Sequence, residues 1–263
     1  MKIFKYYPPT KFSFNALEEG YFWFNFPENY NDPFDTNLSF QMSGSKKEWY
    51  NFLKISMKYS DSKIDKLFSS NAIIENVPYN IPIFQDNYRE SRVVSCFSKK
   101  NNSILMWSHY ANKHTGFCLG FKTIRPNKYH LVNIIDDESI DNIEFRNKKY
   151  IPLLKVEYLP RKTRPFNPLN DSDDILLKNI LQKADVWSYE NEFRLVIKPK
   201  HYKENIVKYS KEILSDVYIG YNTSDSTIKE IISILKFSYK KYIKIHYPDK
   251  SINDYLIKYK DFI

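Results

Sequence analysis

The sequence predicts an α+β protein with a mixed, largely antiparallel β-sheet and flanking helices. Short segments of alternating apolar and polar residues recur along the chain, segments with apolar residues at helical spacing lie between them, and prolines or polar turns separate the two kinds. Strands and helices intermixed in this way are typical of the α+β class. Because no internal repeat and no long polar linker occurs, we expect residues 1–263 to form a single domain.

The first elements are predicted to be a strand, a short helix and a second strand. Lys2–Tyr7 alternates and is closed by two prolines, Ser13–Glu19 has helical spacing with Gly20 as its C-cap, and Tyr21–Asn25 is strongly aromatic. The loop FPENYNDPFD follows, and its asparagines and aspartates suit turns because their side chains bond to the nearby backbone. A loop this polar is either a rigid turn or one wall of a site.

Two helices at about residues 41–75 are predicted to form an insertion that packs on the sheet. Ser45–Glu48 fits a capping box, in which a serine and a glutamate each bond to the other's backbone N–H, and apolar residues at helical spacing follow it. Ser62–Asp65 fits a second box and is expected to begin the second helix.

The central stretch is predicted to form a strand (Val93–Ser98), a short helix (Ile104–Lys113) and a second strand (Gly116–Phe121). One face of this helix would carry an indole, a phenol and an imidazole beside a small residue, at positions i, i+3, i+7 and i+4: Trp107, Tyr110, His114 and Ala111. Rings at this spacing either anchor a helix to a sheet or line a site.

The C-terminal half is predicted to contain further strands and helices after an acidic, irregular segment around Asp136–Glu138. In chain order these are a strand at Leu153–Leu159, a helix at Asp173–Trp187, a strand from Glu190, a strand at Asp216–Gly220, a helix at Ser224–Leu235 and a strand at Lys241–His246. The loop RKTRPFNPLNDSDD is either a solvated surface or a contact for phosphate groups, through its basic residues Arg161, Lys162 and Arg164.

A polar edge is predicted on the strand within WSYENEFRLVIK. Side chains alternate along a strand, so Glu192 and Arg194 face one way, with Glu190 expected to join them, while the apolar residues between them face the other. Two carboxylates and a guanidinium on one edge form either a structural ion-pair ladder or an acid/base site held by a cation.

The composition favours a protein of the reducing cytosol. The net charge of +9 attracts polyanions, although the lysines are scattered, as they are on an ordinary solvated surface. The two cysteines, Cys96 and Cys118, sit in apolar strands and offer no disulfide framework. The N-terminus lacks the apolar run of a signal peptide and no segment reaches transmembrane length, so we expect a cytoplasmic protein without a membrane partner.

Several kinds of chemistry are disfavoured because their motifs are missing. The sequence has no phosphate-binding glycine loop, dinucleotide fingerprint, HExxH, GxSxG or EF-hand pattern, and its five histidines are too dispersed for a zinc site, so no metal is expected. Polar residues at predicted strand ends and loops remain as site candidates: Ser95, Ser98, Asn31, Asp32, Glu190, Glu192 and Arg194, together with the aromatic helix face. Such a set suits electrostatic stabilisation of developing positive charge.

An ordered set of motifs resembles a widespread bacterial family catalogued only as a domain of unknown function. The motifs are KYY, FWFNFPENYNDPFD, SCFS, MWSHYANKHTGFCLGF, WSYENEFRLV and VYIG, and they span about Lys5 to His246. Their order is also similar to that of ADP-ribosyltransferases. This second resemblance implies an ADP-ribosyltransferase-like core that uses NAD as its substrate.

The resemblance implies a role for each matching position. Lys5-Tyr6 would take the first-strand position, Phe24–Tyr30 the wall beside nicotinamide, Ser95–Ser98 the polar strand motif, and Glu190-Asn191-Glu192 the Glu-x-Glu motif. Lys5-Tyr6 differs from the usual Arg or His, and Ser-Cys-Phe-Ser differs from Ser-Thr-Ser.

The implied mechanism assigns roles to the acidic, basic and aromatic candidates. Glu192 would bond to the ribose, Glu190 would orient or deprotonate the acceptor, Arg194 would hold the carboxylates or a phosphate, and Tyr30 or Tyr110 would contact nicotinamide. Cofactor contacts are also expected from the remaining candidates: Lys5, Tyr6, Asn31, Asp32, Ser95, Ser98 and Trp107. His114 is expected among the catalytic residues.

The expected partners are a nucleotide-like small molecule and a protein or nucleic-acid acceptor. An effector or toxin of a bacterial defence or toxin–antitoxin system, with a neutralising partner protein, fits the resemblance. Two other classes stay open: a nucleic-acid-directed effector such as a nuclease, and a sensor that binds a nucleotide-like ligand without turnover.

Overall fold

The computed structural model describes residues 1–26, 29–36, 40–79, 92–126, 128–135, 140–141, 149–199, 205–251 and 256–261. Two predicted features fall partly or wholly outside these ranges. They are the acidic segment Asp136–Glu138 and, within the predicted nicotinamide wall, Pro27 and Glu28.

The chain divides into two compact units. Unit 1 consists of Met1–Phe26, Arg92–Tyr158 and Asp185–Ile263, and unit 2 consists of Pro27–Ser91 and Leu159–Ala184. The predicted helical insertion lies within unit 2, which also includes a second, distant segment of the chain. The expectation of a single domain stays a prediction.

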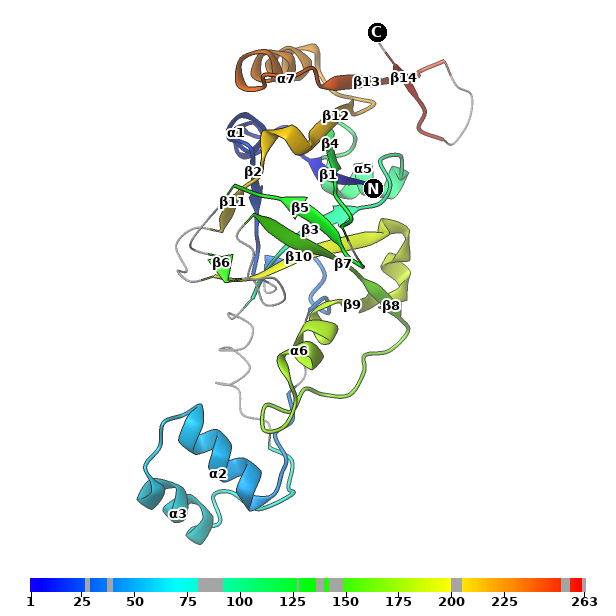
Figure 1. The fold of residues 1–263 in the computed structure, drawn as a ribbon. Coiled ribbons are helices and arrows are strands. Elements are labelled where there is room, and N and C mark those ends of the chain that lie inside the picture. The colour runs from blue at the N-terminus through cyan, green and yellow to red at the C-terminus, as the bar shows by residue number, and fades with distance from the viewer. Residues whose placement is uncertain are drawn as a thin grey trace. The chain divides into compact units, whose positions relative to one another are not determined.

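Unit 1 is built on a large open sheet, so the predicted α+β class is confirmed (Figure 1). Among the described residues its strands follow the order β14-β13-β12-β4-β1-β3-β10-β7-β5, and β6 pairs with β10. The pairing is antiparallel except between β12 and β13. The bounds are β1 Lys2–Tyr7, β3 Val93–Ser98, β4 Phe117–Lys122, β5 His130–Asn133, β6 Ile140–Asp141, β7 Tyr150–Lys155, β10 Glu192–Pro199, β12 Leu214–Ile219, β13 Lys244–Pro248 and β14 Tyr259–Asp261.

Short strands and helices complete the described elements. The short strands are β2 Tyr21–Trp23, which pairs with β11 Ile206–Lys208, and also β8 Glu157–Leu159 and β9 Gln182–Ala184. The α-helices are α1 Lys11–Glu19, α2 Lys46–Ile55, α3 Asp61–Ser69, α5 Ile104–Tyr110, α6 Asp173–Ile180 and α7 Asp225–Ser238. The 3₁₀ turns are η2 Asp185–Glu190 and η3 Lys211–Ile213.

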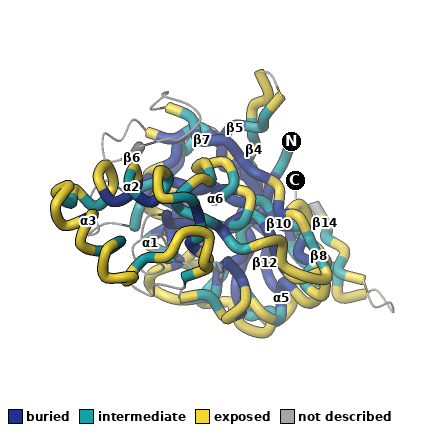
Figure 2. Tube along the Cα trace, turned by 90° about the horizontal axis from the view of Figure 1, so that it is seen from below, coloured by how far each residue is buried: buried dark blue, intermediate teal, exposed yellow. Residues whose placement is uncertain are grey.

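The sheet of unit 1 buries side chains on both faces. One face, with α1 and α7, holds the main core, which includes Ile3, Phe97, Leu119 and Leu195. The opposite face carries a second cluster that packs around Trp107 of α5. Figure 2 shows most of β10 and β12 as buried and much of α2 and α3 as exposed.

Unit 2 has its own small core around α2 and α3, which contact each other (Figure 1). Five buried apolar residues form it: Met42, Trp49, Phe52, Leu53 and Ile64. The predicted capping box at Ser45 and Glu48 is confirmed. The second predicted cap is wrong, because the hydroxyl of Ser60, and not that of Ser62, accepts from the backbone N–H of Lys63 and begins α3.

Two helices end earlier than their apolar spacing predicts. The helix expected over Ile104–Lys113 stops at Tyr110, because Asn112, Lys113 and His114 adopt left-handed backbone with φ of 46°, 56° and 66°. The turn then passes close to the end of β1 at Gly116, where an added Cβ would lie 2.0 Å from the carbonyl oxygen of Tyr7. Only a glycine fits this approach.

The second shortened helix was expected over Asp173–Trp187. It ends at Ile180, and the chain continues through β9 into η2. The apolar spacing of Leu176, Leu177 and Ile180 is real, but Ala184 lies on a strand. The strand expected over Leu153–Leu159 is likewise divided, with a break at Val156.

Candidate active site

Three neighbouring strands of unit 1 carry six of the thirteen predicted site residues: Lys5, Tyr6, Ser95, Ser98, Glu192 and Arg194. The sheet places β3 between β1 and β10. Ser98 is paired with Phe4 on one side and with Glu192 on the other. Segments separated by about ninety residues along the chain therefore meet at the end of β3.

The predicted residues on these strands divide between the two faces of the sheet. Ser95 shares the core face with Phe97, because side chains alternate along β3, whereas Ser98 takes the opposite face. Lys5 lies with the first group, where its Nζ donates to Ser95 Oγ at 2.9 Å and to the carbonyl of Cys96 at 3.0 Å. Burial lowers the pKa of Lys5, although the thiol of Cys96 and the carboxylate of Glu192 act in the other direction.

Glu192 and Arg194 form a two-point ion pair within β10. Arg194 Nε donates to Glu192 Oε1 at 2.8 Å, and its Nη2 donates to Oε2 at 3.1 Å. Glu192 is 4% exposed and Arg194 is 0% exposed. The backbone N–H of Glu192 donates to the Tyr158 hydroxyl at 2.8 Å, which fixes the start of the strand. A buried carboxylate needs such partners because its desolvation is costly.

Glu190 lies in η2 and not on the strand, so its expected alignment with Glu192 is corrected. Asn191 between them has a left-handed φ of 46°, which turns the chain. Glu190 is 2% exposed, and its Oε1 accepts from the Tyr110 hydroxyl at 2.6 Å. The Ser98 hydroxyl donates to the backbone carbonyl of Glu190 at 2.6 Å. Tyr110, Ser98 and both glutamates thus lie close together.

The rings of the central stretch have structural partners. Trp107 is fully buried, and its indole N–H donates to the carbonyl of Asn101 at 2.7 Å. Tyr6 packs edge-on against Trp107, with the ring centroids 5.2 Å apart, and its hydroxyl donates to the carbonyl of Lys100. Burial strongly raises the pKa of Tyr6.

His114 is brought to Trp107 by the left-handed turn rather than by a helical face. Its ring stacks on Trp107 with a centroid distance of 6.3 Å, and its Nε2 lies 3.2 Å from the Ser108 hydroxyl. Burial lowers the pKa of His114. Trp107 and His114 are therefore neighbours, as predicted, but a left-handed turn and not a shared helical face brings them together.

The remaining predicted contacts, Tyr30, Asn31 and Asp32, belong to unit 2. Asp32 is buried, and its Oδ1 accepts from the backbone N–H of Phe34 at 2.9 Å, as in the turn that its sequence predicts. Asn31 is exposed. These three residues are not assigned to the site of unit 1.

Unit 1 contains a second buried polar cluster, which the sequence did not predict. Asp216 of β12 accepts from Lys2 at 2.6 Å, from Ser215 at 2.5 Å and from His246 Nε2 at 2.8 Å. His246 stacks on Tyr218 with a centroid distance of 4.3 Å. An aspartate within a predicted strand was the available signal, but two of its three partners, Lys2 and His246, lie on β1 and β13.

Neither cysteine is suited to act as a nucleophile. Burial raises the pKa of both Cys96 and Cys118, which disfavours the reactive thiolate. Within the described ranges, no three His, Cys, Asp or Glu side chains are grouped so that they could hold a metal ion. None of the described helices is long and apolar enough to cross a membrane.

In comparisons with known proteins, part of the chain matches a family model. No curated protein and no solved structure matches it. Residues 106–195, which include Tyr110, Glu190, Glu192 and Arg194, match the model of a family described as "Protein of unknown function (DUF2971)". The predicted resemblance to a family of unknown function is thus confirmed over this stretch, and the resemblance to ADP-ribosyltransferases stays a prediction.

Proposed function

We propose that this protein transfers ADP-ribose from NAD to a protein or nucleic-acid acceptor. One observation carries the proposal: β1, β3 and β10 are neighbours and bring together the three segments to which the resemblance gives a role. Ser98 contacts both Glu190 and the start of β10, on the face of the sheet that also carries Glu192, whereas Lys5 and Ser95 contact each other on the opposite face. The spacing of these three segments along the sequence does not by itself require them to be neighbours in the sheet.

The proposed reaction breaks the bond between nicotinamide and C1′ of the ribose. Nicotinamide leaves with the bonding electron pair and becomes neutral, while positive charge develops on the ribose. The carboxylate of Glu192 stabilises that charge, because a preorganised opposite charge acts most strongly where water is excluded. The acceptor then bonds to C1′ and gives its proton to Glu190.

Arg194 and Tyr110 have positioning roles in this scheme. The guanidinium of Arg194 holds the Glu192 carboxylate at two points and fixes its orientation. The hydroxyl of Tyr110 fixes the Glu190 carboxylate through one short hydrogen bond. Because both carboxylates are almost fully buried, a ribose hydroxyl has to replace the Tyr110 hydroxyl or approach beside it.

The test is transfer of label from radiolabelled NAD to protein and nucleic-acid acceptors. We expect Glu192→Gln to lower the rate by about a hundredfold to a thousandfold, as removal of one preorganised electrostatic group does. Glu190→Gln should lower transfer more than NAD binding, because its role is directed at the acceptor. Glu157→Gln is the matched control, since Glu157 is an exposed glutamate of the same unit.

Folding must be measured alongside, because Glu192→Gln leaves a buried guanidinium with a weaker partner. A thermal melt of each variant separates a lost fold from a lost activity. Tyr110→Phe adds a milder change that removes one hydroxyl. The proposal is wrong if the folded wild type neither binds NAD nor transfers label, or if Glu192→Gln transfers as fast as the wild type.

A further inference from the structure

Unit 2 contains a cavity of about 180 Å³ that the proposed reaction does not use. Basic and polar side chains line it beside apolar ones, and six of them are Arg161, Lys162, Thr163, Arg164, Gln182 and Lys183. None of the described lining residues is acidic. The cavity therefore has the chemistry of an anion site, and all of its described lining residues belong to unit 2.

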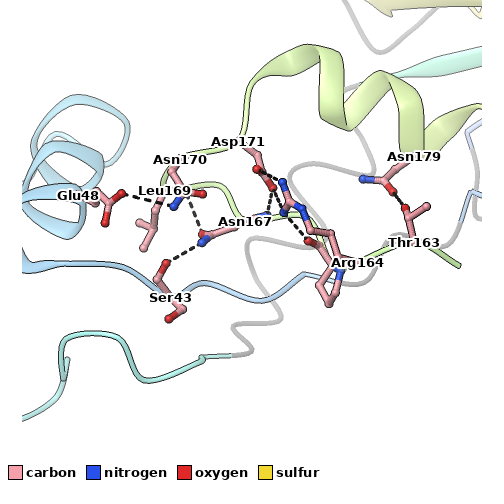
Figure 3. A network of polar contacts seen from close by, with 10 residues as sticks. Ser43, Glu48, Thr163, Arg164, Asn167, Leu169, Asn170, Asp171 and Asn179 are labelled. Atoms are coloured by element: carbon pink, nitrogen blue, oxygen red, sulfur yellow. Dashed lines mark hydrogen bonds and ion pairs between the residues drawn. The ribbon is translucent and has the colours of Figure 1, made fainter.

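Arg164 and Lys183 are each paired with a carboxylate that does not line the cavity. Arg164 donates to Asp171 at 2.7 and 2.5 Å, within the loop network shown in Figure 3. Lys183 is buried, and its Nζ lies 3.2 Å from Asp35. Arg161, in contrast, is exposed and makes no ion pair or hydrogen bond with any residue that the structure describes. Its charge is available to a ligand.

Gln182 supplies a second, independent indication of a ligand. The residue is 9% exposed, and its Nε2 is buried without a hydrogen-bond partner among the described residues. Its Oε1 lies 3.0 Å from the Thr163 hydroxyl, which also lies 3.0 Å from Asn179 Oδ1. One hydroxyl hydrogen serves only one of these oxygens. Turning the Asn179 amide removes this conflict, because its N–H then donates to the Thr163 hydroxyl, and it leaves Gln182 Nε2 as an unpartnered donor. A buried amide left in this state is costly unless something else accepts its hydrogen.

We propose that this cavity binds a small phosphate monoester, such as a sugar phosphate or a nucleoside monophosphate. The phosphate oxygens accept from Arg161, Lys162 and the Gln182 amide. Phe34, which is 69% exposed, lines the same cavity and offers an apolar surface to the organic part of the ligand. The volume is below the roughly 300–1,000 Å³ of pockets for drug-sized ligands, so the ligand has to be small.

One feature of the wall opposes an anion, but it is weaker than the cations. Asn179 at the C-terminal end of α6 borders the cavity, and a helix C-terminus carries roughly half a negative charge. The full positive charge of Arg161, which is paired with no carboxylate that the structure describes, outweighs this. A nucleic-acid strand fits less well, because Gln182 and Lys183 are among the buried residues of the wall, where a polymer backbone does not reach.

The experiment is calorimetric titration of the full chain with ribose 5-phosphate, and with ribose as the ligand that lacks the phosphate. We expect ribose 5-phosphate to bind with one-to-one stoichiometry and ribose not to bind. Arg161→Gln should weaken binding by about tenfold to a hundredfold, the usual effect of losing a hydrogen bond to a charged group. Because Arg161 is exposed, this variant should fold normally.

Arg125→Gln is the matched control, since it removes the same charge from an exposed arginine of unit 1. If Arg125→Gln weakens binding as much as Arg161→Gln, only the overall charge attracts the ligand and the site is refuted. Absence of binding at millimolar ribose 5-phosphate also refutes it. So does binding of oligonucleotides alone, with affinity that grows with their length. Ribose 5-phosphate is also a part of NAD, so the Arg161→Gln variant, and not binding alone, assigns the ligand to this cavity. Arg161 belongs to unit 2 and has no role in the proposed transfer reaction, so failure of this proposal and failure of that reaction are distinguishable.

Discussion

At the scale of single residues, Asp216 is a buried carboxylate outside the candidate active site, and its neighbours stabilise its charge. Burial alone would raise the pKa of Asp216, but hydrogen bonds from Lys2, Ser215 and His246 more than offset it, so the pKa lies below its usual value. A carboxyl group whose pKa is lower in the folded state stabilises the fold at pH values above its unfolded pKa of 3.8. That contribution is lost as the pH falls through the depressed value.

We therefore expect Asp216→Asn to lower the free energy of unfolding near neutral pH by about 1 to 3 kcal/mol, since it removes the charge but keeps the shape. The difference from the wild type should shrink on acidification, because the wild-type carboxylate must then be protonated. Urea denaturation between about pH 6 and pH 3 measures this. A difference that stays constant over that range would contradict the assignment. Asp225→Asn, at an exposed aspartate of α7, is the control.

Also at the residue scale, Glu190 shows where strand alternation fails to predict the position of a side chain. Alternation correctly places Glu192 and Arg194 on one side of β10, because a strand has a fixed period of two. It fails for Glu190, because the left-handed Asn191 breaks the period, and the sequence signal for such a backbone is weak outside glycine.

At the scale of elements, the two helix caps of unit 2 differ in how clearly the sequence predicts them. Ser45 and Glu48 satisfy each other's backbone N–H groups, so the cap is specified twice. The second helix has two serines within its first residues, Ser60 and Ser62. Only Ser62 has an acidic residue three positions later, Asp65, but Ser60 fills the cap position in the structure.

We expect Ser45→Ala and Ser60→Ala each to lower the free energy of unfolding by about 0.5 to 2 kcal/mol, because each removes a cap that satisfies a backbone N–H. Ser62→Ala should change it by less than either, since Ser62 is exposed and lies inside the helix. Hydrogen exchange at the amides of α2 and α3 during denaturation reports on this unit, because three of the four tryptophans belong to unit 1 and fluorescence would not separate the units. If Ser62→Ala lowered the free energy of unfolding as much as Ser60→Ala does, the result would support Ser62 as the cap, as the sequence predicts.

At the scale of the whole molecule, each unit has its own apolar core. The core of unit 1 spreads over most of the sheet, whereas that of unit 2 is small and centred on α2 and α3. Regions with few buried apolar contacts open more readily than large cores. The two units are therefore expected to differ in the free energy of local opening.

We expect Leu53→Ala to destabilise unit 2 by about 2 to 5 kcal/mol, because it leaves a cavity in a small core. Hydrogen exchange should then accelerate over α2 and α3, while the amides of β1, β3 and β10 keep their protection. Leu119→Ala, in the core of unit 1, should show the opposite distribution. Equal acceleration throughout the chain after either change would instead support the single cooperative domain that the sequence predicts.

By itself, the sequence determined the fold class, the positions of most strands, the first capping box and the alternation of Glu192 and Arg194. These features depend on neighbours within a few residues, so local spacing encodes them. Only the tertiary structure decided the order of β1, β3 and β10, the partners of Glu190 and Asp216, and the basic cavity around Gln182. These depend on which distant segments pair and on the surface that they bury together, and no local period records that choice.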